Sequence, residues 1–183
     1  DAGTTGRAFV QVGHGGHSQS NGVMTDAEAN DITITSGGYV SVVGTAAGSP
    51  VANTAAQAYA QIGHGGRGSQ GASAGATARE RYGDITIVAI GTDAGGNAIV
   101  LQGGKSNESY VQIGHGGRDA RSYAKGDIDI DAAGNVSVEG GERERTYATI
   151  ARGGDDSETT PGTLGVGGLG TLEGNDGLVE ITT

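Results

Sequence analysis

A short motif returns four times along this chain, and that repetition limits the folds open to it. The copies read AFVQVGHGG at 8–16, AYAQIGHGG at 58–66, SYVQIGHGG at 109–117 and TYATIARGG at 146–154. The spacing is 50 residues from His14 to His64, 51 from His64 to His115, and 37 from His115 to Arg152. Motifs of constant length joined by segments of variable length indicate a solenoid, in which each repeat stacks on its neighbours.

Two further motifs follow in a fixed order. The second reads DITI at 31–34, DITI at 84–87, DIDI at 127–130 and, more weakly, LVEI at 178–181; the third reads YVSVVG at 39–44, AIVLQGG at 98–104 and NVSVEGG at 135–141. Apolar residues alternate with polar ones in each motif, which is typical of strands with one buried face. The predicted core ladders are Val12, Ile62, Ile113 and Ile150; Ile32, Ile85 and Ile128; Ile34, Ile87 and Ile130; and Val40 with Val136.

Three strands in each repeat, separated by Gly-rich corners, predict an all-β fold. We expect a parallel β-helix, or β-solenoid, with three strands per coil and three to four coils in all. Stacked coils place equivalent residues about 4.8 Å apart, so β-branched side chains form continuous ladders. The repeats span residues 1–154, with motif starts near 8, 58, 109 and 146. Residues 155–183 form a Gly-rich C-terminal segment, read as a weak last coil or a tail that docks on another subunit.

Composition excludes several classes of protein. There are 38 glycines but only two prolines and no Gly-X-Y period, which excludes collagen. The net charge of −10 argues against nucleic acid and anionic lipid as partners. No apolar run approaches the roughly 18 residues of a membrane helix, so no membrane insertion is expected. The absence of cysteine suits a bacterial exported protein that avoids disulfide chemistry.

The motifs YAQIGHGG, GDITI and GNVSVEGG resemble the repeat region of filamentous haemagglutinin-like bacterial exoproteins. The resemblance covers the chain from about Ala8 to Gly154 and weakens from Asp155 onward. It implies a right-handed β-helical shaft, an extracellular or cell-surface location, and a structural, adhesive or matrix-building role without catalysis.

One repeat position collects most of the aromatic residues. Alternation points these side chains outward, beside a row of amides; the positions are Phe9, Tyr59, Tyr110 and Tyr147, with Gln11, Gln61 and Gln112. An exposed aromatic and amide ladder predicts a contact strip for a neighbouring subunit or for sugar rings. The alternative is that loops of the same chain fold over the strip and bury it.

Another repeat position holds His14, His64 and His115. Imidazoles on adjacent coils could share a metal ion. The structural interpretation, in which each histidine bonds backbone and shapes the G-H-G-G turn, is favoured because Arg152 takes the fourth position and arginine is not a metal ligand. We therefore predict no metal and no cofactor at this turn.

A ladder of aspartates begins the second motif, at Asp31, Asp84 and Asp127. Stacked like charges repel, so each carboxylate either caps a turn amide or shares a cation with its neighbours. Calcium has some support from GNDG at 174–177 and the acidic pair at 155–156, but the nonapeptide calcium repeat is absent. Capping of a turn amide is therefore the favoured interpretation.

No catalytic constellation emerges, so the chain is not expected to be an enzyme. The remote enzymatic alternative, a β-helical polysaccharide-degrading enzyme, would need an unrepeated carboxylate pair, and Glu80, Glu142 and Glu144 are more simply solvated charges.

The ends of a β-helix expose unpaired backbone groups and a cross-section of the apolar core. We expect a self-associating filament built head to tail, with Leu164, Val166, Leu169, Leu172, Val179 and Ile181 as docking residues. Alternatively, the end rungs stack on neighbouring repeats of a longer chain instead of on another copy. A non-polymerising adhesin shaft that binds glycans or a cell surface is the other candidate function.

Overall fold

The fold consists of strands. The computed structural model describes residues 9–16, 30–44, 58–68, 80–81, 83–120, 123–124, 126–153, 158–160, 163–164 and 179–183. Within these ranges there is no α-helix, and three parallel sheets run through the molecule. The predicted all-β fold with parallel strands is therefore confirmed, and its strand order is that of a solenoid.

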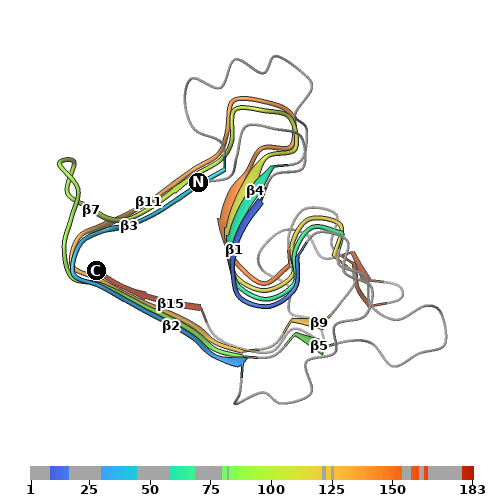
Figure 1. Ribbon diagram of the computed structural model, residues 1–183, viewed down its shortest axis with the longest axis horizontal. Coiled ribbons are helices and arrows are strands. Elements are labelled where there is room, and N and C mark those ends of the chain that lie inside the picture. The colour runs from blue at the N-terminus through green and yellow to red at the C-terminus, as the bar shows by residue number, and fades with distance from the viewer. Residues whose placement is uncertain are drawn as a thin grey trace.

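Each motif supplies one sheet. Sheet A contains β1 (Phe9–Val12), β4 (Tyr59–Ile62), β8 (Tyr110–Ile113) and β12 (Ala148–Ile150). Sheet B contains β2 (Ile32–Ser36), β6 (Ile85–Ala89), β10 (Ile128–Ala132) and β15 (Val179–Thr182). Sheet C contains β3 (Val40–Val43), β7 (Asn97–Gln102) and β11 (Asn135–Glu139). Figure 1 shows the equivalent strands of each sheet superposed, one behind another.

Two small pairs complete the described strands. β5 (Glu80–Arg81) and β9 (Tyr123–Ala124) pair in parallel, and β13 (Glu158–Thr160) and β14 (Thr163–Leu164) pair antiparallel. We call one strand of each main sheet, taken in chain order, a rung. Rung 1 is β1, β2 and β3; rung 2 is β4, β6 and β7; rung 3 is β8, β10 and β11; rung 4 is β12 and β15.

Successive rungs pair in the register that the motifs predict. Tyr59 lies opposite Tyr110 in sheet A, and Ile85 lies opposite Ile128 in sheet B. The weak copy LVEI also takes its place, because Val179 lies opposite Ile128. Equivalent residues therefore form ladders, as expected from strict alternation.

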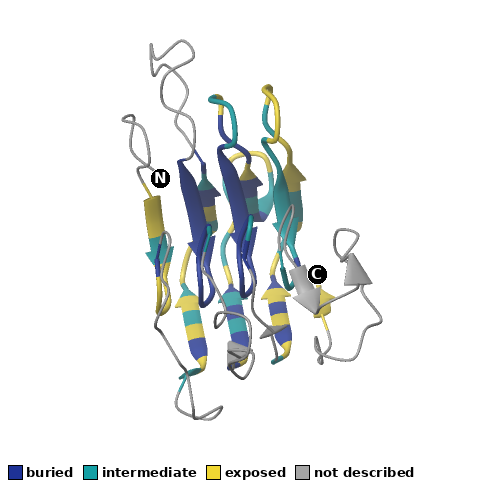
Figure 2. Cartoon of the chain, turned by 90° about the vertical axis from the view of Figure 1, so that its right-hand side faces the viewer, coloured by how far each residue is buried: buried dark blue, intermediate teal, exposed yellow. Residues whose placement is uncertain are grey.

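The predicted core ladders form the interior. Seven of these residues are buried in one hydrophobic cluster, and Ile34, Val40, Val136 and Ile150 pack against it; the buried seven are Ile32, Ile62, Ile85, Ile87, Ile113, Ile128 and Ile130. Burying an isoleucine side chain contributes about 1.5–3 kcal/mol, so these ladders are the main source of stability. Val12 is the exception and is exposed, because it belongs to the first rung and the described residues place no strand beyond β1. Figure 2 shows the buried interior in dark blue and this end strand in yellow.

Glycine is required where the chain leaves sheet A. Gly63 and Gly114 have φ of +148° and +143°, which L side chains rarely adopt. A Cβ on Gly63 would lie 2.0 Å from the carbonyl oxygen of Gly114 in the next rung. The G-H-G-G turns can therefore stack at strand spacing only with glycine at this position.

Candidate functional site

The aromatic side chains of the first motif form one continuous stack beside sheet A. Ring centroids are 5.1 Å apart between Phe9 and Tyr59, 5.1 Å between Tyr59 and Tyr110, and 4.9 Å between Tyr110 and Tyr147. Tyr59 and Tyr110 are 0% exposed. The expectation of an exposed contact strip is therefore wrong for these two tyrosines, and burial by the same chain is correct.

The segment that covers the aromatic stack is the G-H-G-G turn that follows each strand. A Cβ on Gly66 would lie 2.7 Å from the hydroxyl of Tyr59, and one on Gly117 would lie 2.9 Å from the hydroxyl of Tyr110. The turn thus passes back over the outer face of its own strand. Alternation predicts the direction of a side chain but not what lies on that side, which is why the sequence left exposure and burial of the strip as alternatives.

The amide ladder also lies inside this cover. Gln61 Nε2 donates to the carbonyl oxygens of Gly114 and Gly116 in the next rung, at 2.9 and 2.6 Å. Gln11 and Gln112 donate to the matching carbonyls of the rungs that follow them. The glutamines therefore connect rungs and, in the middle of the stack, are buried rather than offered to a ligand.

The histidines form a third column, in which backbone groups occupy both ring nitrogens of His64 and His115. The backbone N–H of His14 donates to Nδ1 of His64, and that of His64 donates to Nδ1 of His115, both at 3.0 Å. Acceptance at Nδ1 places the ring proton on Nε2. His115 Nε2 donates to the carbonyl of Gly83 at 2.7 Å, and His64 Nε2 donates to that of Asn30. These contacts agree with a turn-shaping role and leave no ring nitrogen of His64 or His115 for a metal.

The arginine of the fourth copy keeps one of these contacts. Arg152 Nε donates to the carbonyl oxygen of Gly126 at 2.7 Å. Gly126 immediately precedes Asp127, as Gly83 precedes Asp84, so Arg152 bonds the carbonyl that a histidine would reach. Arginine has no acceptor, however, so the bond that Nδ1 accepts in the other copies is absent here.

The aspartate ladder also connects rungs. The backbone N–H of Asp84 donates to Oδ1 of Asp31 at 2.8 Å, and that of Asp127 donates to Oδ1 of Asp84 at 2.7 Å. The predicted capping of turn amides is therefore observed. No group of three or more potential metal ligands gathers within the described ranges, and the stretches 155–156 and 174–177 lie outside them.

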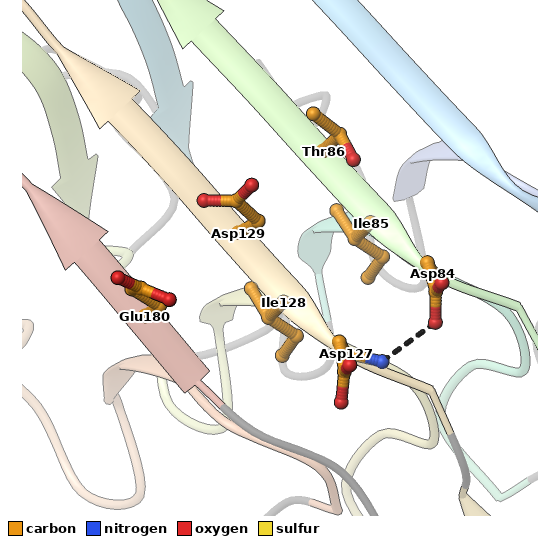
Figure 3. A pocket seen from close by; sticks show the side chains of 7 residues that line it. All are labelled: Asp84, Ile85, Thr86, Asp127, Ile128, Asp129 and Glu180. Carbon is orange, nitrogen blue, oxygen red and sulfur yellow. Dashed lines mark hydrogen bonds between the residues drawn. The ribbon is translucent and has the colours of Figure 1, made fainter.

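A shallow acidic groove lies on sheet B (Figure 3). It has a volume of about 220 Å³ and crosses β6, β10 and β15; its lining is Asp84, Ile85, Thr86, Asp127, Ile128, Asp129 and Glu180. Asp129 lies opposite Glu180 in the strand register. Neighbouring carboxylates on parallel strands repel, so this face resists anionic partners.

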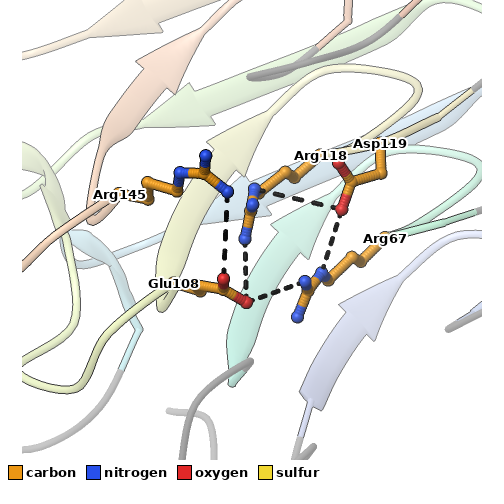
Figure 4. A network of polar contacts seen from close by, with 5 residues as sticks. All are labelled: Arg67, Glu108, Arg118, Asp119 and Arg145. Atoms are coloured by element: carbon orange, nitrogen blue, oxygen red, sulfur yellow. Dashed lines mark hydrogen bonds and ion pairs between the residues drawn. The ribbon is translucent and has the colours of Figure 1, made fainter.

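A cluster of ion pairs, which the sequence did not indicate, includes the arginines that follow two of the G-H-G-G turns (Figure 4). Arg67 and Arg118 occupy equivalent positions in two G-H-G-G-R turns, and both are buried. Glu108 Oε2 accepts a hydrogen bond from Arg67 Nη2 at 2.8 Å and forms an ion pair with Arg118, whose Nη1 lies 3.0 Å away. Asp119 lies 3.5 Å from Arg67, and Arg145 lies 4.0 Å from Glu108.

The electrostatics and the backbone of this cluster support each other. Partial burial by itself raises the pKa of Glu108, but Arg118 and Arg67 outweigh it, and the pKa of this carboxyl is lowered from its ordinary value. Three non-glycine residues in the described ranges have positive φ, and all belong to the cluster: Glu108 at 60°, Asp119 at 57° and Arg145 at 55°. Such conformations are unfavourable and persist only when the surroundings hold them.

The remaining predicted residues do not converge on a site. Glu142 pairs with Lys105 at 3.2 Å on the surface, and Glu144 is exposed. For Glu80 and Leu164 only the backbone is described. Val166, Leu169 and Leu172 lie outside the described residues, whereas Val179 and Ile181 are exposed in β15.

Both ends of the stack expose apolar side chains. Phe9, Val10 and Val12 of rung 1 are 45%, 42% and 46% exposed. At the other end Val179 and Ile181 are 40% and 43% exposed. The equivalent positions in rungs 2 and 3 are buried, so the exposure of these side chains comes from their place in the end rungs.

Comparison with known proteins finds no similarity: no family model matches the chain, and searches of curated proteins and of solved structures return no match. None of the elements in the described ranges is a helix of the length and apolarity that crossing a membrane requires.

Proposed function

We propose that this chain is a structural unit of an extracellular bacterial filament or adhesin, in which right-handed, three-sided β-helices stack head to tail. The stacking partner is a second copy of the chain. The observation that carries the proposal is the exposure of Val10 and Val12 in rung 1 and of Val179 and Ile181 in rung 4. These residues expose core cross-section at both ends, and the motif resemblance supports the surface location.

The arrangement of the side chains favours a structural role over a binding role. The aromatic, amide, histidine and aspartate ladders all bond or stack between rungs. A glycan-binding shaft would require aromatic rings at the surface, but Tyr59 and Tyr110 are covered by their own turns. A contact that repeats without closing produces an open filament.

The proposal is tested by imaging the purified chain in negative stain and by sedimentation over a range of concentrations. We expect filaments whose amount rises with concentration. In the double variant Val10→Lys/Val12→Lys, inward-facing charges should prevent docking and leave monomers. Ile90→Lys is the matched control, because Ile90 is 64% exposed but lies on rung 2, away from both ends. Monomers of the unmodified chain at every concentration would refute the proposal, and would favour neighbouring repeats of a longer chain as the stacking partner.

A further inference from the structure

The same residues of each rung bond the next rung throughout sheet A. In sheet A the backbone N–H of Val111 donates forward to the carbonyl of Tyr147 in rung 4, and Ile113 accepts from Ala151. Gln61 donates its side-chain amide forward to rung 3. Each rung therefore presents one set of groups to the rung after it and a different set to the rung before it.

The two end strands carry the complementary halves of this pattern. Ala148 and Ile150 are equivalent to Val111 and Ile113, so their backbone groups face the free edge of β12. In β1 the carbonyl of Val12 accepts from Gly63 of rung 2, so the backbone of the adjacent Gln11 faces the opposite, free edge. If β12 of another copy lies before β1, its free backbone groups therefore meet the free backbone groups of β1.

Resting on the proposed function, we infer that β12 of one copy pairs in parallel with β1 of the next copy, in the register of the internal rungs. Tyr147 then lies opposite Phe9 and Thr149 opposite Gln11, which continues the stack of rings 4.9–5.1 Å apart. In sheet B, Glu180 lies opposite Thr33, so no like charges meet there. In the described part of the chain sheet C has three strands, so the inferred pairing concerns sheets A and B.

The same comparison identifies this joint as the weakest contact between rungs. Thr149 occupies the position of Gln112. Its hydroxyl is too short to reach the carbonyls of Gly13 and Gly15 in the next copy, which are equivalent to those that Gln11 reaches in rung 2. The joint therefore lacks the side-chain amide hydrogen bonds that glutamine makes between the other rungs, and it is the place where we expect the filament to separate.

The register is tested by disulfide cross-linking, because the chain contains no cysteine. Thr33 and Glu180 are exposed, so one protein carries Thr33→Cys and the other Glu180→Cys. Paired strands place opposed Cα atoms about 4.8 Å apart, within the disulfide range of about 4.4–6.8 Å. Oxidation of the mixture should produce a covalent dimer. Thr35→Cys replaces Thr33→Cys in the register control, because a diagonal pair is about 7–8 Å apart and should cross-link at least roughly tenfold less.

The outcomes of this experiment separate the register from the proposed function. Filaments that form without the Thr33–Glu180 cross-link, or with equal cross-linking from position 35, overturn the register and leave the filament standing. The absence of filaments from the unmodified chain refutes the proposed function itself.

A gain of function tests the weak joint. Thr149→Gln restores the two amide donors and should lower the concentration needed for filaments about tenfold, since each bond contributes about 0.5–1.5 kcal/mol. Thr149→Glu is the matched control, because it has the same length but accepts only. The urea midpoint of the monomer should stay the same in both variants. Equal assembly by Thr149→Gln and Thr149→Glu would overturn the amide explanation.

Discussion

The backbone N–H of His64 donates to Nδ1 of His115 at 3.0 Å, so the imidazole of one rung accepts from the rung before it. The same ring donates from Nε2 to the carbonyl of Gly83. His115→Ala removes both bonds and leaves two buried backbone groups unsatisfied. Each such group costs about 1–3 kcal/mol, so we expect a loss of about 2–6 kcal/mol in the free energy of unfolding. Urea denaturation followed by circular dichroism measures it.

The first rung supplies the matched control for this prediction. The ring of His14 is exposed at the end of its column and stacks on that of His64 from one side. His14→Ala should therefore change the urea midpoint of the monomer much less than His115→Ala does. An equal loss from both substitutions would show that the turn depends on imidazole itself rather than on the buried hydrogen bonds.

The buried tyrosines predict instability in alkali. Burial raises the pKa of Tyr110 well above its ordinary value, and the hydroxyls of Tyr147 and Tyr59 raise it further, against the opposing backbone N–H of Arg118. Burial likewise raises the pKa of Tyr59, opposed by Arg67. A raised pKa gives stability that is complete below the unfolded value of about 10 and is lost as pH rises above it. The phenolate absorbance and the circular dichroism should therefore change together in an alkaline titration.

The double variant Tyr59→Phe/Tyr110→Phe checks this cause. It should move the midpoint of alkaline unfolding to higher pH. It should change the stability little at neutral pH, because neither hydroxyl has a partner in hydrogen-bonding geometry. Phe9 already fills the equivalent place in rung 1. Tyr39→Phe is the control, since Tyr39 is half exposed. An alkaline midpoint that shifts with Tyr39→Phe but not with the double variant would contradict the assignment.

Sequence reasoning predicted the sheets and their register because both follow from local pattern. The alternation of Ile85 and Ile87 determines which face is buried, and the repeat determines that Ile85 meets Ile128. It left the exposure or burial of Tyr59 open, since the course of the chain after Gly63 depends on stacking of the turns. Val12 has the pattern of a core residue and is exposed only through its place in the first rung.

The ion-pair cluster was beyond reach for a different reason. The arginines repeat at Arg67 and Arg118, but their partner Glu108 occurs once and lies in a connecting segment of variable length. A repeat comparison discards such residues as loop charges. Only the fold shows that this segment brings Glu108 against the two buried guanidinium groups, beside Asp119.

Glu108 predicts a loss of stability in acid. The pKa of Glu108 is lowered because Arg118 and Arg67 outweigh the opposing effect of burial. A lowered pKa gives stability that is present above the ordinary value of 4.5 and is lost as pH falls through the folded value below it.

Glu108→Gln should therefore cost about 3 kcal/mol at neutral pH, because it leaves Arg67 and Arg118 buried without their shared carboxylate. The free energy of unfolding of this variant, measured by urea denaturation at successive pH values, should also fall less as the pH is lowered (the acid limb of the stability curve). Glu142→Gln, which breaks an exposed pair with Lys105, should cost less than about 1 kcal/mol and leave the acid limb unchanged. Identical acid limbs for the unmodified chain and Glu108→Gln would assign the acid sensitivity to other carboxylates.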